Sequence, residues 1–132
     1  MSRMIFVNLP VQDLDKSVAF FTELGFDFNA AFTDENATCM VVSEQAFVML
    51  LVRPFFATFT RKEVADASVT ETTVGLSAGS REEVDALVDR ALALGATAVT
   101  PPQDEGYMYG RSFYDLDGHL WDFIWMDPAA QG

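Results

Sequence analysis

Near its end the chain reads Asp115-Leu116-Asp117-Gly118-His119-Leu120-Trp121-Asp122. An Asp-Gly pair is typical of a tight hairpin turn, because glycine adopts a positive φ without strain. The flanking runs 107–114 and 119–126 are rich in aromatic and apolar residues, which favours strands. The sequence therefore predicts an antiparallel hairpin in which Asp115 lies opposite His119 and Ser112 lies opposite Asp122.

A strand, a helix and a short strand are predicted upstream of this hairpin. Residues 72–78 are predicted to form the first strand. Ser80-Arg81-Glu82-Glu83 matches a capping box, in which the serine and glutamate side chains satisfy free N–H groups at the start of a helix. Gly95 is predicted to end that helix, and residues 97–100 to form the short strand. With the hairpin, this gives the order β-α-β-β-β.

The first half of the chain repeats this order. A strand is predicted over residues 3–9, ended by Pro10, and Asp13 is predicted to cap a helix that runs to Gly25. Three more strands are predicted, at 26–32, 37–42 and 46–52. The chain is thus predicted to be one domain over 1–132, with module 1 at 3–52, a linker at 53–71 and module 2 at 72–126.

The predicted linker is rich in phenylalanine. It contains Phe55, Phe56 and Phe59 after Pro54. Clustered phenylalanines need a surface to cover. They either pack on the domain or on a second subunit, or they form a lid over a pocket.

The repeat predicts an α+β fold built from two βαβββ modules. Each module is expected to form a curved sheet with a helix on its convex side. The two sheets are expected to pair into an incomplete barrel around a cleft, which is the usual kind of small-molecule site.

Composition narrows the choice of partners and compartment. The 132 residues include 8 Lys and Arg against 20 Asp and Glu, which gives a net charge of −12. Such a surface repels phosphate backbones and anionic lipids, so we expect neither nucleic acid nor a membrane as a partner. Cys39 is the only cysteine and is expected to be buried in a reduced compartment. The apolar stretch at 4–7 is too short for a signal peptide, so the sequence predicts a cytoplasmic protein.

These features resemble the vicinal-oxygen-chelate superfamily, which includes glyoxalase I, bleomycin-resistance proteins and extradiol dioxygenases. The resemblance covers nearly the whole chain and looks strongest to a branch described as predicted lactoylglutathione lyases. Because this fold hosts lyases, oxygenases, isomerases and pure binders, the resemblance does not fix an activity. It is carried by the paired modules, by the Asp115–Asp122 stretch, and by Val11-Gln12-Asp13-Leu14-Asp15-Lys16-Ser17 with Phe20-Phe21 and Leu24-Gly25-Phe26.

The resemblance also implies where a metal would bind. Metal-dependent members take ligands, usually His, Gln or Glu, from four strand positions, which fall here at Asn8, Leu50, Thr73 and Asp122. Leu50 cannot ligate, and Asn8 and Thr73 offer only weak neutral oxygens. The chain has one histidine, which argues against the two-histidine iron site of a dioxygenase. We therefore predict no tightly bound cofactor; the alternative is a divalent Zn, Ni or Mn ion at Asp122.

A metal-free site is predicted on one face of the last hairpin. Strand alternation places Met108, Gly110, Ser112, Tyr114, Leu120, Asp122 and Ile124 on that face. Arg111 falls on the other face, where it either extends outward at the strand end or is turned into the cleft by a bulge at Gly110, to anchor an anionic ligand. The predicted ligand-binding residues are Asn8, Leu50, Thr73, Met108, Arg111, Ser112, Tyr114 and Asp122.

Three side chains keep alternative roles. Asp122, the best catalytic candidate, is a metal ligand, a general base, or a carboxylate satisfied by Ser112 and backbone N–H groups. His119 is a turn residue bonded to Asp115 or Asp117, or else a general acid or base. Asn8, polar within an apolar strand, pairs with a ligand or with the backbone.

The sequence predicts a homodimeric, glyoxalase- or bleomycin-resistance-like protein that binds a small organic molecule in an apolar cleft without a tightly bound metal, and it leaves open whether the molecule is turned over. The alternative is a metal-dependent glyoxalase-like lyase or isomerase that uses Asp122. A third hypothesis is an interaction module that uses the phenylalanine-rich linker.

Overall fold

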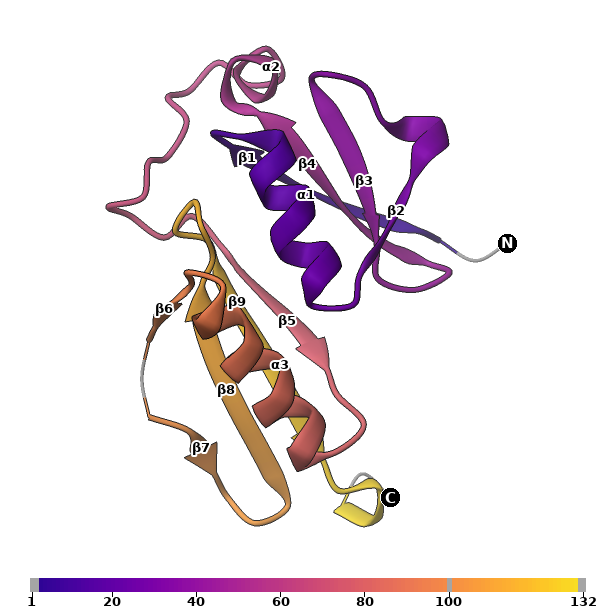
Figure 1. The fold of residues 1–132 in the computed structure, drawn as a ribbon, viewed down its shortest axis with the longest axis vertical. Coiled ribbons are helices and arrows are strands. Elements are labelled where there is room, and N and C mark those ends of the chain that lie inside the picture. Colours follow the sequence, from indigo (N-terminus) through magenta and orange to yellow (C-terminus); the bar gives the residue numbers. More distant parts are fainter. Residues whose placement is uncertain (1–2, 100, 131–132) are drawn as a thin grey trace. The chain divides into compact units, whose positions relative to one another are not determined.

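Two βαβββ units make up the chain in the computed structural model, which describes residues 3–99 and 101–130. The first unit spans Met1–Val64 and the second Ala65–Gly132 (Figure 1). The predicted α+β class and internal repeat are therefore confirmed. The boundary between the units falls inside the segment 53–71, and the pairing of the modules into an incomplete barrel stays a prediction.

The first unit is built on a four-stranded sheet in the order β1-β4-β3-β2. Strand β1 runs parallel to β4, and the other neighbours are antiparallel. The elements are β1 (Ile5–Val11), α1 (Leu14–Glu23), β2 (Asp27–Asn29), β3 (Ala37–Val41) and β4 (Ala46–Val52). Asp13 caps α1 as predicted, accepting a hydrogen bond from the Lys16 N–H at 3.1 Å.

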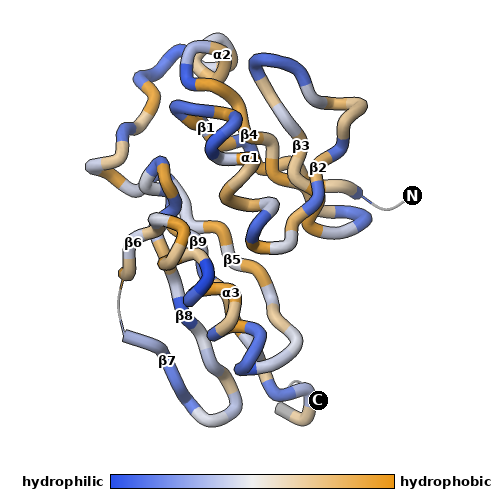
Figure 2. The backbone as a smooth tube through the Cα atoms, viewed as in Figure 1, coloured by the Kyte–Doolittle hydropathy of each residue, from blue (hydrophilic) through white to orange (hydrophobic). Residues whose placement is uncertain are grey.

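The core of the first unit lies on the face of the sheet that α1 covers. Leu9, Val48 and Leu50 share this face by register and are at most 2% exposed. Phe20 and Phe21 of α1 are buried with them. Figure 2 shows the continuous hydrophobic colouring of β4 in this core. The opposite face is more open, since Phe6 is 47% exposed there.

Two boundaries in this unit differ from the prediction. Pro10 does not end β1, which runs to Val11. Because β1 is an edge strand, the missing N–H of proline is tolerated. The strand predicted over 26–32 stops at Asn29, whose Oδ1 accepts from the Ala31 N–H at 2.9 Å and starts a 3₁₀ helix over Ala30–Phe32.

The phenylalanine-rich segment begins with a short helix, α2 (Arg53–Ala57), which packs against β1 and β4. The Phe55 and Phe59 rings meet edge to face, with centroids 5.1 Å apart. Phe55 and Phe56 are half-buried, whereas Phe59 is 70% exposed. Two of the three rings therefore pack on their own unit.

The second unit has a sheet in the order β5-β9-β8-β6, with β7 paired to β8. Its elements are β5 (Thr73–Ser77), α3 (Arg81–Ala93), β6 (Thr97–Ala98), β7 (Gln103–Asp104), β8 (Met108–Tyr114) and β9 (Leu120–Met126), followed by a 3₁₀ helix over Pro128–Ala130. The short strand β7 was not predicted. Thr100, at the end of the strand predicted over 97–100, lies outside the described residues.

The capping box and the hairpin are both confirmed. Ser80 Oγ accepts from the Glu83 N–H at 3.0 Å, and the Glu83 carboxylate accepts from the Gly79 N–H. In the hairpin, Ser112 lies opposite Asp122, and the Asp115 N–H donates to the His119 carbonyl at 2.9 Å. None of the helices within 3–99 and 101–130 has the length and apolar character needed to cross a membrane.

Gly118, at this turn, gives a first prediction. Gly118 and Gly106 both have φ +83°, but a Cβ on Gly118 would lie 3.0 Å from Ala67 Cβ, whereas one on Gly106 meets nothing within 4 Å. We expect Gly106→Ala to lower the free energy of unfolding by about 1 kcal/mol, from backbone strain alone. Gly118→Ala should cost about 1–2 kcal/mol more, from the added clash. Urea unfolding of the two variants measures this difference, and equal losses would show that Ala67 moves aside freely.

Candidate functional site

The sheet of the second unit has one covered face and one open face. Phe113, Trp121 and Phe123 lie on the covered face, at most 1% exposed, with the buried residues of α3. We call the opposite side the open face. By strand register it consists of Thr73, Gly75, Ser77, Thr97, Gln103, Met108, Gly110, Ser112, Tyr114, Leu120, Asp122, Ile124 and Met126, all half-buried or exposed. The predicted alternation of the β8–β9 hairpin is thus confirmed.

A pocket of about 380 Å³ lies at the open face. It is lined by Gly75, Leu76, Ser77, Ala78, Ile124 and Met126. Gly75 lies opposite Asp122 in the parallel register, and its missing side chain leaves open space. The volume falls within the range of ligand pockets, and apolar walls with a few polar groups are typical of them.

A hydroxyl–carboxylate pair lies beside this pocket. Ser112 Oγ donates a hydrogen bond to Asp122 Oδ1, and both residues are half-buried. Among the residues that the structure describes, Oδ2 of Asp122 has no hydrogen-bond partner. Of the hydrogen bonds predicted for Asp122, the one from Ser112 is therefore present, and the second carboxylate oxygen is left for a ligand.

The turn next to this pair is held by a buried carboxylate. Asp115 is 6% exposed, and its Oδ1 accepts from the Asp117 and His119 backbone N–H groups at 2.9 and 3.0 Å. Its Oδ2 accepts from Trp121 Nε1 at 2.9 Å. Burial raises the pKa of the Asp115 carboxyl.

His119 belongs to the same buried cluster. Its Nδ1 lies 2.8 Å from Oε1 of Glu71, and its side chain is 6% exposed. His119 precedes β9, and its backbone N–H donates to Asp115 Oδ1 within the turn. The geometry favours the turn role over the acid–base role, with Glu71 as an additional partner of the imidazole. Glu71 lies in the predicted linker, where no motif singled it out.

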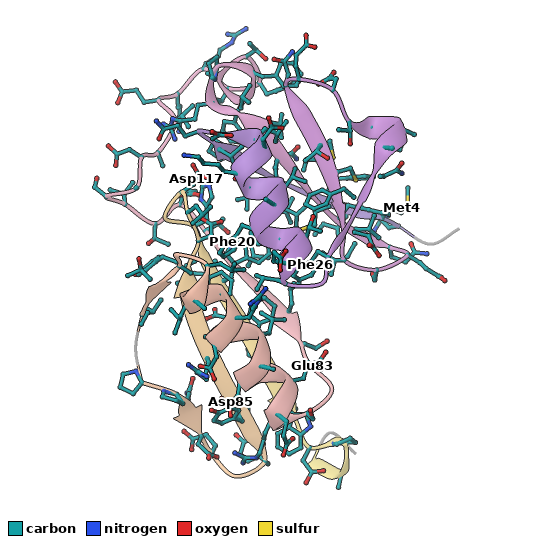
Figure 3. The ribbon with its side chains drawn as sticks, viewed as in Figure 1. Met4, Phe20, Phe26, Glu83, Asp85 and Asp117 are labelled. Carbon is teal, nitrogen blue, oxygen red and sulfur yellow. The ribbon has the colours of Figure 1, made fainter. Side chains whose placement is uncertain are left out.

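Arg111 is not on the open face. Its Nη1 donates to Asp85 Oδ1 and also lies 2.9 Å from Asp89 Oδ1. Both aspartates belong to α3, on which Figure 3 labels Asp85. Tyr109 Oη also donates to Asp85 Oδ1, at 2.6 Å, and this bond, followed by that from Arg111, holds the pKa of Asp85 below its usual range. Of the two placements that the sequence left open for Arg111, the structure shows the one on the covered face and not the one in a cleft. The spacing of Asp85 and Asp89, one helical turn apart, was the sequence signal for this ion pair.

The expected placement of Leu50 is wrong. Leu50 is fully buried on the face of the first sheet that α1 covers. Its neighbour Met49 takes the opposite face, together with Asn8. A shift of one residue reverses the face in a strand, and the sequence pattern did not resolve it. Asn8 is exposed and donates from Nδ2 to the Phe6 carbonyl at 3.3 Å, so it pairs with the backbone.

Arg81 fastens β7 to the start of α3. Its guanidinium donates to both carboxylate oxygens of Asp104, each at 2.9 Å, and to the Gly106 carbonyl at 2.8 Å. It also lies 5.1 Å from the Tyr109 ring centroid and 5.2 Å from that of Trp125. The hydrogen bonds that Asp104 accepts, those of Arg81 first, lower its pKa to about 2.

The Arg81–Asp104 ion pair leads to a prediction about how stability depends on pH. Because the pKa of Asp104 is lower in the folded protein, its stabilising effect is present above the unfolded value near 3.9 and is lost as pH falls toward 2. Replacing Arg81 by Gln should return the pKa of Asp104 toward about 3.9. A carbon-detected NMR titration of the Asp104 carboxyl measures this, and an unchanged pKa in the variant would contradict the role of Arg81.

The open face of the second unit offers few metal ligands of its own. Within residues 3–99 and 101–130, no three His, Cys, Asp or Glu side chains lie close enough to hold a metal. Asp122 is the only carboxylate among the strand residues of the open face, and Thr73 is exposed on the same face. A stable oxygen or nitrogen cage needs several such ligands.

Comparisons with known proteins point to one family. Residues 3–43 match a family model described as bleomycin resistance protein-like N-terminal. The structure of a hypothetical protein, SA1046 from S. aureus, is 31% identical, with a TM-score of 0.79 and 94% of each chain covered. A search of curated proteins found no match.

Two more distant structures share the fold. A glyoxalase/bleomycin resistance protein/dioxygenase family enzyme from Burkholderia phytofirmans has a TM-score of 0.78 at 17% identity, covering 95% of this chain and 99% of that one. The fosfomycin resistance protein FosX from Listeria monocytogenes has a TM-score of 0.71 at 19% identity, covering 100% and 99%. FosX has also been solved with Mn(II) and a sulfate ion. At these identities the likeness concerns the fold alone.

Proposed function

Because this chain belongs to the vicinal-oxygen-chelate superfamily, of the glyoxalase and bleomycin-resistance type, we propose that it binds a small organic molecule on the open face of its second sheet. One observation carries the proposal. The half-buried Ser112–Asp122 pair lies on the same face as an apolar-walled pocket of about 380 Å³.

The chemistry of the open face supports a ligand with both apolar and polar parts. Leu76, Ile124 and Met126 offer apolar contact in the pocket. The Ser112 hydroxyl holds one oxygen of Asp122, so the other oxygen has a defined direction. Tyr114 adds a ring and a hydroxyl on the same face. A few placed polar groups among apolar walls fix the orientation of a small molecule.

Binding without turnover is favoured by the donor set. Acid–base catalysis needs groups positioned to take and to give a proton. The strand residues of the open face supply one carboxylate, Asp122, and the buried His119 side chain is paired with Glu71. We therefore assign Asp122 the role of a binding anchor that orients the ligand. We also propose a cytoplasmic homodimer, from the lone buried Cys39 and the family resemblance.

A thermal-shift screen tests this function. A library of small organic molecules is added to the purified protein, whose metal content is measured first. At a concentration one hundred times its Kd, a ligand should stabilise the protein by about 2.7 kcal/mol. If no compound class raises Tm, the proposal fails. One Zn, Ni or Mn ion per chain, lost in Asp122→Ala, would instead support a metal-dependent lyase or isomerase.

A further inference from the structure

We infer that the site on the open face selects an organic cation, such as an amine on an apolar scaffold, and rejects anions. This inference rests on the proposed function and adds the charge class of the ligand. It follows from which charged side chain shares the open face with the pocket and which charged side chains are held in ion pairs elsewhere.

The only charged strand residue on the open face is Asp122. The other charged residues in the strands of the second unit, Asp104 and Arg111, lie on the covered face by register. The remaining strand residues of the open face are uncharged. Asp122 therefore sets the sign of the electrostatic potential at this face.

No cation of the second unit is available to offset this charge. The segment 65–132 contains three arginines, Arg81, Arg90 and Arg111, and no lysine, against twelve Asp and Glu. Arg111 is held by two aspartates of α3, and Arg81 by Asp104. Arg90 lies in the last turn of α3, the helix on the covered face. An anionic ligand would thus meet a carboxylate with no compensating positive group of this unit.

An ammonium group fits the Ser112–Asp122 pair. It has three N–H donors and no acceptor. One N–H of the ammonium can donate to Oδ2 of Asp122. A second can donate to Ser112 Oγ, because the Ser112 hydroxyl uses its hydrogen for Asp122 and still has lone pairs to accept with. A charge-assisted contact of this kind is stronger beside apolar walls such as Ile124 than in bulk water. The apolar part of the ligand would then fill the pocket.

Three matched probes test the inference: 1-naphthylmethylamine, 1-naphthylmethanol and 1-naphthoic acid. They share an aromatic skeleton and differ in charge at pH 7. Binding is measured by NMR titration of the amide signals of Gly75, Ser77 and Ser112. We expect the amine to bind at least tenfold more tightly than the alcohol, and the acid more weakly than either.

Two variants assign the effect to Asp122. Asp122→Asn should abolish the preference, so that the amine and the alcohol bind with similar affinity. Glu82→Gln, an exposed residue of α3, changes the net charge equally and should keep the preference. If the three probes bind with equal affinity, or the acid binds best, the charge selectivity is overturned while the binding function stands. If no probe shifts these amides at any concentration reached, both fail.

Discussion

Replacing Asp115 by Ala should lower the free energy of unfolding by about 3 kcal/mol or more, because three donors, two of them in buried hydrogen bonds, lose their acceptor together. The donors are the backbone N–H groups of Asp117 and His119 and the indole N–H of Trp121. Trp121 is fully buried, so water cannot replace the lost carboxylate there. Urea unfolding at constant pH measures the loss.

Two further substitutions distinguish the contribution of the Trp121 indole N–H to stability from that of the two backbone N–H groups. Asp115→Asn keeps an oxygen for the backbone N–H groups but loses the acceptor for Trp121, so we expect a loss of about 1–2 kcal/mol. In a Trp121→Phe background, which has no indole donor, Asp115→Asn should cost clearly less than in the native chain. If Asp115→Ala costs under about 1 kcal/mol, the turn is not held by this carboxylate.

The largest functional effect is expected at Asp122. Asp122→Ala should weaken binding of a ligand found in the screen by tenfold to more than one hundredfold, since a hydrogen bond to a charged group contributes about 1.5–3 kcal/mol. Ser112→Ala should weaken it less, because the carboxylate stays but is no longer oriented. Isothermal titration calorimetry measures both affinities. Both residues are only half-buried, so Tm of the unliganded variants should change little, and affinities within twofold of the native value would remove Asp122 from the site.

Much of the fold is predictable because its signals are local. Asp13 and Ser80 start their helices through bonds within four residues along the chain. The Asp-Gly turn sets the register of β8 and β9 and therefore which residues share a face. Counting outward from that turn is enough to pair Ser112 with Asp122.

The errors concern residues whose partners are distant in sequence. Arg111 is held by Asp85 and Asp89 of α3, a contact that no strand pattern reveals. The turn role of His119 was among the predicted alternatives, but its pairing with Glu71 was not. Leu50 was placed on the wrong face because β4 is apolar on both sides and gives no alternation. The continuation of β1 through Pro10 depends on its being an edge strand, which is a property of the whole sheet.

The most direct measurement is the mapping of a bound ligand onto the protein by amide chemical shifts. With a ligand from the screen at saturation, we expect the largest shifts at Gly75, Ser77, Ser112 and Ile124, around the pocket and the Ser112–Asp122 pair. Shifts confined to the first unit, or to the surface of α3, would contradict a binding site on the open face.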